Sequence, residues 1–302
     1  MRVAVDAPNA ADFRCGFVAI AGRPNVGKST LLNRLVGQRV SITSRKAQTT
    51  RHRVTGIVTA PDAQVLFVDT PGFQTKHRSR LNDRMNRAVT QCLADVDASV
   101  IVIEAGRTTD ADRAVIRLLP ANARAIVALN KIDRVKARDA MLPQMAEIAA
   151  LFPFAAIVPV SAEKSRALDV LLAEVRALLP VAAAVYGEDE ITDRDERFLA
   201  AEFVREKIFR LLGEEVPYAT SVAIDRFEQE GALRRIHATV HVDRENQRAI
   251  LLGAGGARMK EIATAARGDM ERLFGGQVYL EVWVHVTRGW ADDEAQLKRF
   301  GY

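Results

Sequence analysis

The segment Gly22–Ser29 reads Gly-Arg-Pro-Asn-Val-Gly-Lys-Ser and constrains the fold more than any other part of the chain. It follows the apolar run Gly16–Ala21 and leads into Lys28–Val36, whose leucines have helical spacing. A glycine-rich turn between a strand and a helix points backbone N–H groups at phosphates, and the helix N-terminus adds a positive field. In this pattern the lysine reaches the outer phosphates and the serine hydroxyl binds Mg²⁺. The residues predicted to contact the bound phosphates or Mg²⁺ are Gly22, Arg23, Pro24, Asn25, Val26, Gly27, Lys28, Ser29 and Thr30.

Up to Pro180, short apolar runs alternate with amphipathic helical stretches. We predict strands at Gly16–Ala21, Val54–Thr59, Val65–Val68, Ser99–Ile103, Ala125–Leu129 and Ala156–Val160. Between them we predict helices at Lys28–Val36, Leu81–Leu93, Asp110–Leu119, Ala140–Leu151 and Leu168–Leu178. This alternation is typical of an α/β, doubly wound P-loop NTPase sheet that is mostly parallel. One antiparallel strand is expected where a turn at Pro61–Asp62 joins two runs.

Three further motifs each follow a predicted strand: Asp69-Thr70-Pro71-Gly72, Asn130-Lys131-Ile132-Asp133 and Ser161-Ala162-Glu163. In the first, the carboxylate holds Mg²⁺ through water and the glycine amide senses the third phosphate. In the second, the aspartate accepts the N1 and N2 protons of guanine, which adenine does not offer. Its lysine lies along the base, and its asparagine ties the loop to the phosphate loop. In the third, a backbone amide meets the guanine oxygen. Since ligands bind at the carboxyl ends of such strands, we expect GTP or GDP with Mg²⁺.

The polar loop Gln48–Arg51 contains two adjacent threonines. One threonine hydroxyl there completes the Mg²⁺ shell only when the third phosphate is present, which orders the loop. The choice between Thr49 and Thr50 stays open at this point, and we favour Thr50. The predicted metal ligands are then Ser29, Thr50 and Asp69, and the groups assigned to hydrolysis are Lys28, Thr50 and Gly72.

Phe73 follows Gly72, where many GTPases carry a glutamine that orients the attacking water. A phenylalanine side chain cannot hydrogen-bond to water, so we predict slow intrinsic hydrolysis that a partner or another group improves. No arginine finger is identifiable from sequence, because Arg45, Arg51 and Arg53 have the setting of solvated loop cations.

Beyond Pro180 the pattern changes. We predict a loose leader at 1–13, a nucleotide domain at 14–180, a linker at 181–194 around the acidic turn Gly187–Glu190, and a second domain at 195–302. The second domain is predicted to contain, in order, Asp195–Leu212 (helix), Thr220–Phe227 and Arg235–Val242 (strands), Gln247–Leu252 and Ala257–Phe274 (helices), and Val278–Val286 (strand). This smaller α+β unit needs a function of its own.

Composition excludes several classes of protein. No run of about 18 apolar residues is present, which argues against a membrane-spanning helix, and the N-terminus lacks a secretory signal. Cys15 and Cys92 are far apart and fit no metal or redox spacing, so we expect free thiols in a reducing cytosol. The net charge of +5 favours a polyanionic partner.

Taken together, these residues resemble the Era family, the bacterial Ras-like GTPases of the TrmE–Era–EngA group. The resemblance runs from Cys15 to Tyr302 and is most specific over Ser41–Arg53, with Tyr218 and Gly289–Glu294 in support. It implies a GTP-dependent role in maturing the small (30S) ribosomal subunit. It also implies a C-terminal type II KH domain that binds the 3′ end region of 16S rRNA, and peripheral contact with the inner membrane of a cytoplasmic protein. We expect a monomer that binds RNA and not DNA.

A KH domain clamps about four single-stranded nucleotides against a Gly-x-x-Gly loop between two helices. Here that loop is Gly253, Ala254, Gly255 and Gly256, with Arg258 and Lys260 placed to meet phosphates. We expect Leu251, Leu252 and Met259 to line the apolar groove. The family usually carries a lysine inside the loop, and its absence here predicts a salt slope lower by about one unit. Nearby arginines that can compensate are Arg234, Arg235, Arg244, Arg248 and Arg267.

Trp283 and Trp290 are predicted to be core or interdomain anchors rather than base-stacking platforms. The histidines His237, His241 and His285 are predicted to be packing or surface residues, not ligands. Three other functions stay open: a P-loop phosphotransferase, an RNA-binding scaffold with a structural nucleotide, and a membrane-surface signalling GTPase. The guanine-reading motif Asn130–Asp133 argues against the first.

Overall fold

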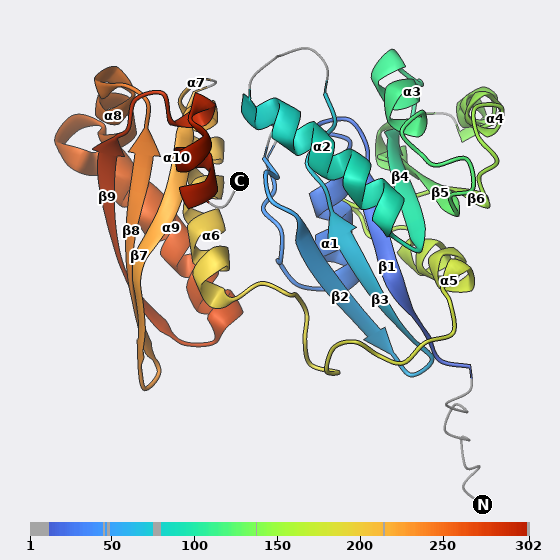
Figure 1. The fold of residues 1–302 in the computed structure, drawn as a ribbon, viewed down its shortest axis with the longest axis horizontal. Coiled ribbons are helices and arrows are strands. Elements are labelled where there is room, and N and C mark those ends of the chain that lie inside the picture. The colour runs from blue at the N-terminus through green and yellow to red at the C-terminus, as the bar shows by residue number, and fades with distance from the viewer. Residues whose placement is uncertain are drawn as a thin grey trace, which may run out of the picture.

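A computed structural model describes residues 12–44, 46, 49–74, 80–136, 138–213 and 215–300. Most of the predicted leader, as well as Arg45, Gln48 and the C-terminal Gly301–Tyr302, lies outside the described residues. The chain folds into two units, each with its own sheet, joined by a connecting segment (Figure 1).

The first unit has a six-stranded sheet in the order β2-β3-β1-β4-β5-β6. Its strands are β1 (Arg14–Ala21), β2 (Val54–Ala60), β3 (Ala63–Asp69), β4 (Ala98–Glu104), β5 (Ala125–Asn130) and β6 (Ala156–Pro159). Its helices are α1 (Lys28–Val36), α2 (Arg80–Asp95), α3 (Asp110–Ile116), α4 (Leu142–Ala149) and α5 (Leu168–Leu178). Only β2 runs antiparallel to its neighbour, so the predicted hairpin and the doubly wound parallel sheet are both confirmed.

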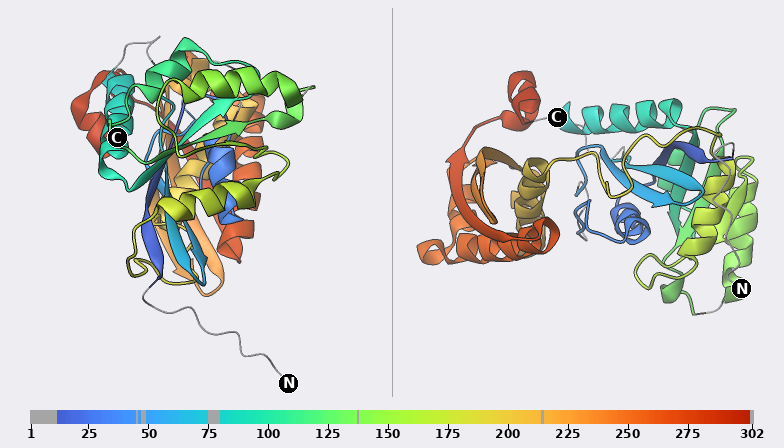
Figure 2. Two further views of the ribbon diagram at one scale, coloured as in Figure 1. Left: turned by 90° about the vertical axis from the view of Figure 1, so that its right-hand side faces the viewer. Right: turned by 90° about the horizontal axis from the view of Figure 1, so that it is seen from below.

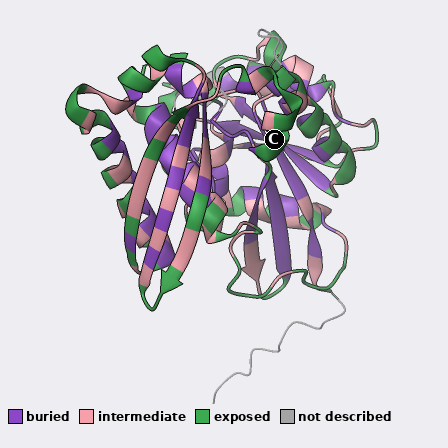
Figure 3. Ribbon diagram, turned by 60° about the vertical axis from the view of Figure 1, so that its left-hand side comes forward, coloured by how far each residue is buried: buried purple, intermediate pink, exposed green. Residues whose placement is uncertain are grey.

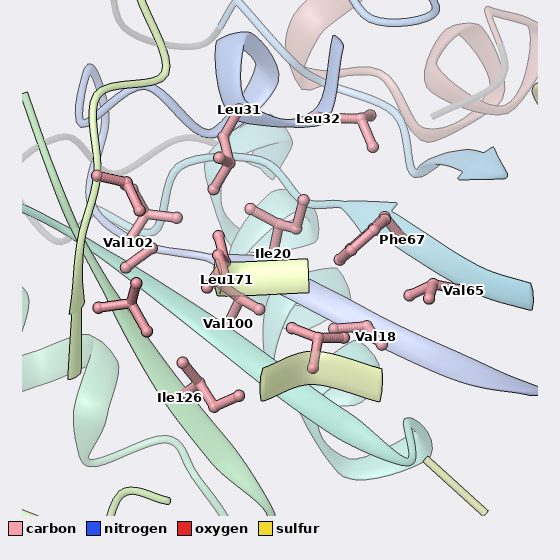
Figure 4. Packing of buried hydrophobic residues seen from close by; sticks show 14 of the residues in the cluster. Val18, Ile20, Leu31, Leu32, Val65, Phe67, Val100, Val102, Ile126 and Leu171 are labelled. Atoms are coloured by element: carbon pink, nitrogen blue, oxygen red, sulfur yellow. The ribbon is translucent and has the colours of Figure 1, made fainter. Parts of the chain in front are cut away.

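Both faces of this sheet are covered, which explains why its strands read as continuous apolar runs. On one face, Val18, Ile20 and Phe67 pack with Leu31 of α1 and Leu171 of α5 (Figure 4). The alternate strand residues pack on the other face against α2, α3 and α4. Full burial of each such side chain stabilises the fold by about 1.5–3 kcal/mol. The phosphate loop and the motif loops are therefore attached to a rigid support.

Two predicted helices were too long. The helix predicted at Asp110–Leu119 ends at Ile116, and the one predicted at Ala140–Leu151 covers only Leu142–Ala149. Pro143 lies in the first turn of α4 and has no N–H to donate to the Asp139 carbonyl, so the α-helical hydrogen bonding cannot run continuously through it. The preceding segment Arg138–Met141 accordingly forms a 3₁₀ turn instead of a continuous helix.

The second unit has a three-stranded sheet in the order β7-β8-β9. Its elements are α6 (Glu196–Leu211), α7 (Glu215–Tyr218), β7 (Thr220–Glu230), β8 (Leu233–Val242), α8 (Glu245–Leu252), α9 (Ala257–Phe274), β9 (Gln277–Val286) and α10 (Glu294–Arg299). The predicted order is confirmed; the short helices α7 and α10 were not predicted.

The second sheet is covered by helices on one face only. Inward residues such as Ile236, Ala238 and Val240 are buried against α6 and α9, whereas their neighbours on β8 point outward. Figure 3 shows the contrast: the first sheet is mostly buried, and the second alternates. Trp283 lies on the open face and is 62% exposed, so its prediction as an anchor was wrong. The helices α6 and α9 lie behind this strand position and leave the Trp283 ring uncovered, whereas His241 on the same face is buried beside the Phe300 ring.

The predicted linker, residues 181–194, makes backbone contacts with the first sheet. It forms bridges between Val181 and Arg14 and between Thr192 and Gly56. Ile57 N–H also donates to the carbonyl of Ile191 at 2.9 Å. Since β2 is an edge strand, the connecting segment satisfies backbone groups that an open edge would expose.

The two units also touch directly through the C-terminal segment (Figure 2). Trp290 is fully buried in a cluster with Leu81 and Met85 of α2 and with Leu297 and Phe300, and its indole N–H donates to the Ala219 carbonyl at 3.0 Å. Its prediction as an interdomain anchor is confirmed. Among the described residues, no helix is both long and apolar enough to cross a membrane.

Candidate functional site

The glycines of the phosphate loop and its surroundings are held at positions that leave no room for a side chain. Gly27 has φ of +102°, and a Cβ there would clash with the amide nitrogen of Asn130. A Cβ on Gly72 would lie 2.9 Å from Pro24 Cα, and one on Gly22 would lie 2.5 Å from the Val102 carbonyl oxygen. Backbone therefore approaches backbone closely here, as a loop that wraps phosphates requires.

Lys28 is buried at the base of this loop. Its ammonium donates to the carbonyls of Gly22 at 3.1 Å and Arg23 at 3.0 Å. Burial lowers the Lys28 pKa to about 8, with Asp69 opposing the shift and Arg23 adding to it. An anion brought against this ammonium would favour its charged form, so the residue is poised to bind phosphate.

Three oxygen-bearing side chains predicted to bind metal converge beside Lys28. Ser29 Oγ donates to Asp69 Oδ2 at 2.7 Å and lies 2.8 Å from Thr50 Oγ1. Burial raises the Asp69 pKa, whereas Lys28 and the donating hydroxyls lower it. The other oxygen, Asp69 Oδ1, is buried and accepts no hydrogen bond from any described residue. One carboxylate and two hydroxyls form a hard-oxygen donor set of the kind that Mg²⁺ takes together with phosphate oxygens.

Thr49 faces elsewhere. Its hydroxyl donates to the Lys46 carbonyl at 2.8 Å and lies 2.9 Å from Ser44 Oγ. The structure therefore brings Thr50, and not Thr49, to the predicted metal ligands. Ser41 Oγ also donates to Asp69 Oδ2, at 2.8 Å. Sequence reasoning assigned Ser41 no role, because nothing in a polar loop marks which serine will reach a carboxylate 28 positions away.

The predicted base-reading motifs meet at the same edge. The Asn130 side chain donates to the Val26 carbonyl at 2.8 Å and accepts from the Ala162 N–H at 2.9 Å. It therefore joins the phosphate loop to both base-side loops. Lys131 donates to the Asn25 carbonyl at 2.7 Å. Each of these two residues adopts positive φ, +67° for Lys131 and +66° for Asn25, which is uncommon outside glycine.

Asp133 is held by the Ser161 hydroxyl, which donates to Oδ1. This hydrogen bond is the main reason that the Asp133 pKa is lowered. An exposed, charged carboxylate at this position suits the acceptance of two N–H groups from a base. Ile132 is partly buried behind it, and the side chain of Glu163 is exposed, with only its carbonyl accepting from Arg34 at 3.4 Å.

Arg23 makes contacts that sequence reasoning missed. Its guanidinium bonds to Asp112 at 3.1 Å and Glu104 at 3.0 Å, and Glu104 also pairs with Lys131 at 3.0 Å. Asp112 belongs to a capping box with Thr109 at the start of α3. The Thr-x-x-Asp spacing was a usable signal for the helix start. It carried no information on the partner Arg23.

The segment that follows β3, residues 70–73, lies against β1 and the phosphate loop. Thr70 Oγ1 donates to the Ile20 carbonyl at 2.9 Å, Pro71 is buried, and Phe73 N–H donates to the Gly22 carbonyl at 3.3 Å. The Phe73 ring packs against the core cluster formed with α2 and α3. A cavity above the phosphate loop is lined from the loop side by Lys28 and Ser29 and from the opposite side by Thr50 and Gly72.

The Gly-x-x-Gly loop of the second unit joins α8 to α9. Gly253, Gly255 and Gly256 all have positive φ, and a Cβ on Gly253 would lie 2.8 Å from Arg258 Cβ. Ala254 lies inside this turn, and Lys260 and Arg258 are exposed beyond it, the latter pairing with Glu261 at 2.9 Å. The loop is open to solvent, as a clamp for a nucleic-acid backbone requires.

Two expectations around this loop were wrong. Leu251 and Met259 are buried in the core of the second unit and do not line an open groove, because the helices pack tightly on the sheet; Leu252 is only partly buried. Arg234 is also buried and bonds to Glu196 at 2.6 and 2.8 Å, so it cannot compensate for a missing loop lysine. The other four arginines of that set are exposed or partly exposed, each with an acidic neighbour.

The loop that carries Thr50 is held by the second unit. Glu206 of α6 accepts from Thr43 N–H at 2.9 Å, and Arg205 donates to the Thr49 carbonyl. Arg51 is not the solvated loop cation expected from the sequence: it is buried and donates to the carbonyls of Thr220, Pro217 and Tyr218 at 2.7, 3.1 and 3.1 Å. Glu206 is fully buried and also pairs with Arg39, which bonds to Asp269 of α9. The nucleotide-side loop is thus tied to the helix that follows the Gly-x-x-Gly loop.

Comparison with known proteins agrees with this geometry. Residues 17–131 match the model of the 50S ribosome-binding GTPase family, and residues 215–291 match the KH domain. The GTPase Era of Nitrosomonas eutropha is 56% identical over 97% of this chain and 99% of its own length. The chain belongs to the Era family. It is accordingly a GTPase, and its second unit is a KH domain.

Other relatives extend the match. GTPase Era of Neisseria meningitidis serogroup B is 55% identical over 97% of this chain and 96% of its own length. The crystal structure of Aquifex aeolicus Era Y63A bound to GDP·AlF₄⁻ superposes with a TM-score of 0.92 at 39% identity, covering 96% of this chain and 99% of that one. A structure of Era with MgGDPNP and nucleotides 1506–1542 of 16S ribosomal RNA matches with the same values.

Proposed function

We propose that this chain is a GTP-driven switch that binds the 3′ end region of 16S rRNA and supports maturation of the 30S subunit. One observation carries the proposal: the loop bearing Thr50 contacts the nucleotide site on one side and α6 of the KH domain on the other. Through this loop, binding or loss of the third phosphate changes the contacts of the RNA-binding domain.

In this proposal Mg²⁺ is held by Ser29 and Thr50, with Asp69 acting through water. Lys28 neutralises charge on the outer phosphates, and the Gly72 amide reads the third phosphate. Asp133 selects guanine, while Asn130 and the Ala162 amide fix the loops around the base. The Phe73 side chain cannot orient the attacking water, so we expect a slow intrinsic rate that a partner or another group improves.

The KH loop supplies the RNA contact. The Gly253–Gly256 backbone approaches the phosphates, and Arg258 and Lys260 add positive charge. The loop contains no lysine, so each bound RNA releases about one counterion fewer than it would with a lysine in the loop. Binding still occurs because the backbone clamp does not depend on that charge.

In this proposal the switch is a monomer in the bacterial cytoplasm. Peripheral contact with the inner membrane stays a second candidate, favoured by the net charge of +5. A phosphotransferase is disfavoured because the exposed Asp133 carboxylate, held by Ser161, suits the two N–H groups that guanine offers and adenine does not.

The test is to measure GTP turnover and RNA affinity together. We expect an RNA covering the 16S 3′ end to raise turnover, and its affinity to differ between GDP and a non-hydrolysable GTP analogue. An RNA of the same length and scrambled sequence is the control. Equal RNA affinity in both nucleotide states would refute the switch and favour a scaffold.

A further inference from the structure

A second cavity, of about 390 Å³, lies between the two domains, and no phosphate-loop residue lines it. We call it the interdomain cavity. Its walls are residues 51–53, which follow the metal-binding Thr50, the helices α2 and α6, Arg194 of the connecting segment, β7, and Phe300. Segments of the nucleotide domain, the connecting segment and the second unit therefore meet at this cavity.

Most of the charged side chains that line the interdomain cavity are positive. Its lining contains five arginines and a single acid, Glu202. The arginines are Arg51, Arg53, Arg84, Arg194 and Arg205. Glu202 is already bonded to Arg205 at 2.6 and 2.7 Å. The walls alone therefore leave an excess of positive charge.

Nearby acids outside the lining offset only part of this excess. Arg84 pairs with Glu294 at 2.6 Å, and Arg194 has Asp193 at 3.6 Å. Arg53 is exposed and, within the described ranges, has no ion-pair partner. The pKa of His52 is lowered to about 4, chiefly by burial, with Glu202 opposing the shift and the cations Arg205, Arg51 and Arg194 adding to it. The rim of the cavity therefore attracts an anion.

The floor of the cavity is apolar and aromatic. Leu81, Met85 and Ala88 of α2 face Phe198 of α6, with Phe300 alongside. The Phe198 ring is contacted edge-on by His52 at 5.5 Å, and the Arg194 guanidinium lies 4.7 Å from its centroid. Flat rings and guanidinium planes are the surfaces on which nucleobases stack. A free inorganic anion would leave this floor unused.

We propose that the interdomain cavity binds a nucleoside phosphate, with its phosphate at Arg53 and Arg194 and its base over the apolar floor. The same chemistry is offered by a single nucleotide of an RNA chain and by a free mononucleotide. Because the walls come from both domains, the bound group stabilises the domain arrangement seen here. The proposal is independent of guanine recognition at the phosphate loop.

The test uses the full chain saturated with GDP and Mg²⁺, so that the phosphate-loop site is filled. In one arm, AMP is titrated calorimetrically, because one nucleotide is too short for the KH clamp. In the other arm, a short single-stranded RNA is titrated against the Gly253→Asp background, in which that clamp is impaired. Saturation with GDP is measured separately, so a failure of the nucleotide site is seen as such.

Two variants and a matched control decide the outcome. Arg53→Ala removes the rim charge and is expected to weaken binding about tenfold. Ala88→Trp fills the cavity from an exposed position that tolerates bulk, and is expected to abolish binding. Arg87→Ala removes an exposed arginine one turn from Arg84 that does not line the cavity, and should leave binding unchanged. The responding arm identifies the source of the ligand. Absence of binding in both arms, or equal binding by all variants, would overturn the proposal.

Discussion

The nucleotide site and the KH loop are both glycine-bearing turns next to a helix N-terminus, yet they are built differently. At the nucleotide site the central polar side chains already have protein partners: Lys28 bonds to carbonyls, Asp69 to hydroxyls and Asn130 to two loops. The KH loop has only its own backbone turn and the exposed Arg258 and Lys260. The first is a rigid, preorganised pocket and the second an open cradle.

The difference follows from how the two sheets are covered. The first sheet is buried on both faces, so the loops at its edge rest on a closely packed core. The second sheet is covered on one face, and its loop sits between two helices with a solvent side. We therefore expect single substitutions to have larger effects at the nucleotide site than at the KH loop. At the nucleotide site, removing one side chain leaves its buried hydrogen-bond partner unpaired.

The largest expected effect comes from Lys28→Ala. Removing the buried ammonium takes away a charge-assisted contact to the phosphates, and GTP affinity should fall about hundredfold or more. Fluorescent-nucleotide titration measures this directly. Lys136→Ala, which removes an exposed lysine of the same domain, is the control. Unchanged affinity in Lys28→Ala would remove this residue from the site.

A comparable loss is expected for Asp133→Asn, but with a change of preference. An amide can accept only one of the guanine N–H groups, so GTP affinity should fall about hundredfold, while xanthosine triphosphate gains a donor for its C2 carbonyl. Competition between the two nucleotides gives the ratio. If GTP is still preferred, the base lies elsewhere.

The KH loop should respond less strongly. Gly253→Asp strains a backbone with φ of +69° and places a negative charge where RNA phosphates approach, so RNA affinity should fall about tenfold with GTP affinity unchanged. Gly231→Asp is the matched control, because it adds the same charge to the same domain at a glycine with φ of +62° and open space around it. Equal RNA affinity in the two variants would contradict the clamp.

The smallest effect concerns pH. The Lys28 pKa of about 8 means that the free protein loses this proton as pH rises above 8, whereas bound phosphates require the charged form. GTP affinity should therefore decrease by about fourfold between pH 7 and 8.5, with proton uptake on binding that grows with pH. Calorimetry in buffers of different ionisation enthalpy counts the protons. No uptake at pH 8.5 would show that Lys28 binds GTP without changing its protonation.

Sequence alone was sufficient for the sheet and for the convergence of the motif loops at one of its edges, and the reason is local. The strand runs at Val65–Val68 and Ala125–Leu129 are read from their apolar continuity, and each motif that follows them is contiguous. Parallel strands then bring their carboxyl ends to one edge whatever the remaining sequence does. The link from Asn130 to the phosphate loop was predicted from these motifs and is confirmed by its hydrogen bond to the Val26 carbonyl.

Tertiary structure decided what depends on long-range packing. Which threonine reaches Asp69, that Arg23 bonds to Asp112, and that Trp283 is exposed while Trp290 is buried are all set by elements far apart in sequence. The hydrogen bond from the Thr43 N–H to the Glu206 carboxylate joins positions 163 residues apart. Hydrophobic periodicity and short motifs each describe one element at a time. They cannot decide which of two neighbouring threonines in a loop reaches a distant carboxylate. The choice depends on the residues that the fold places next to each side chain.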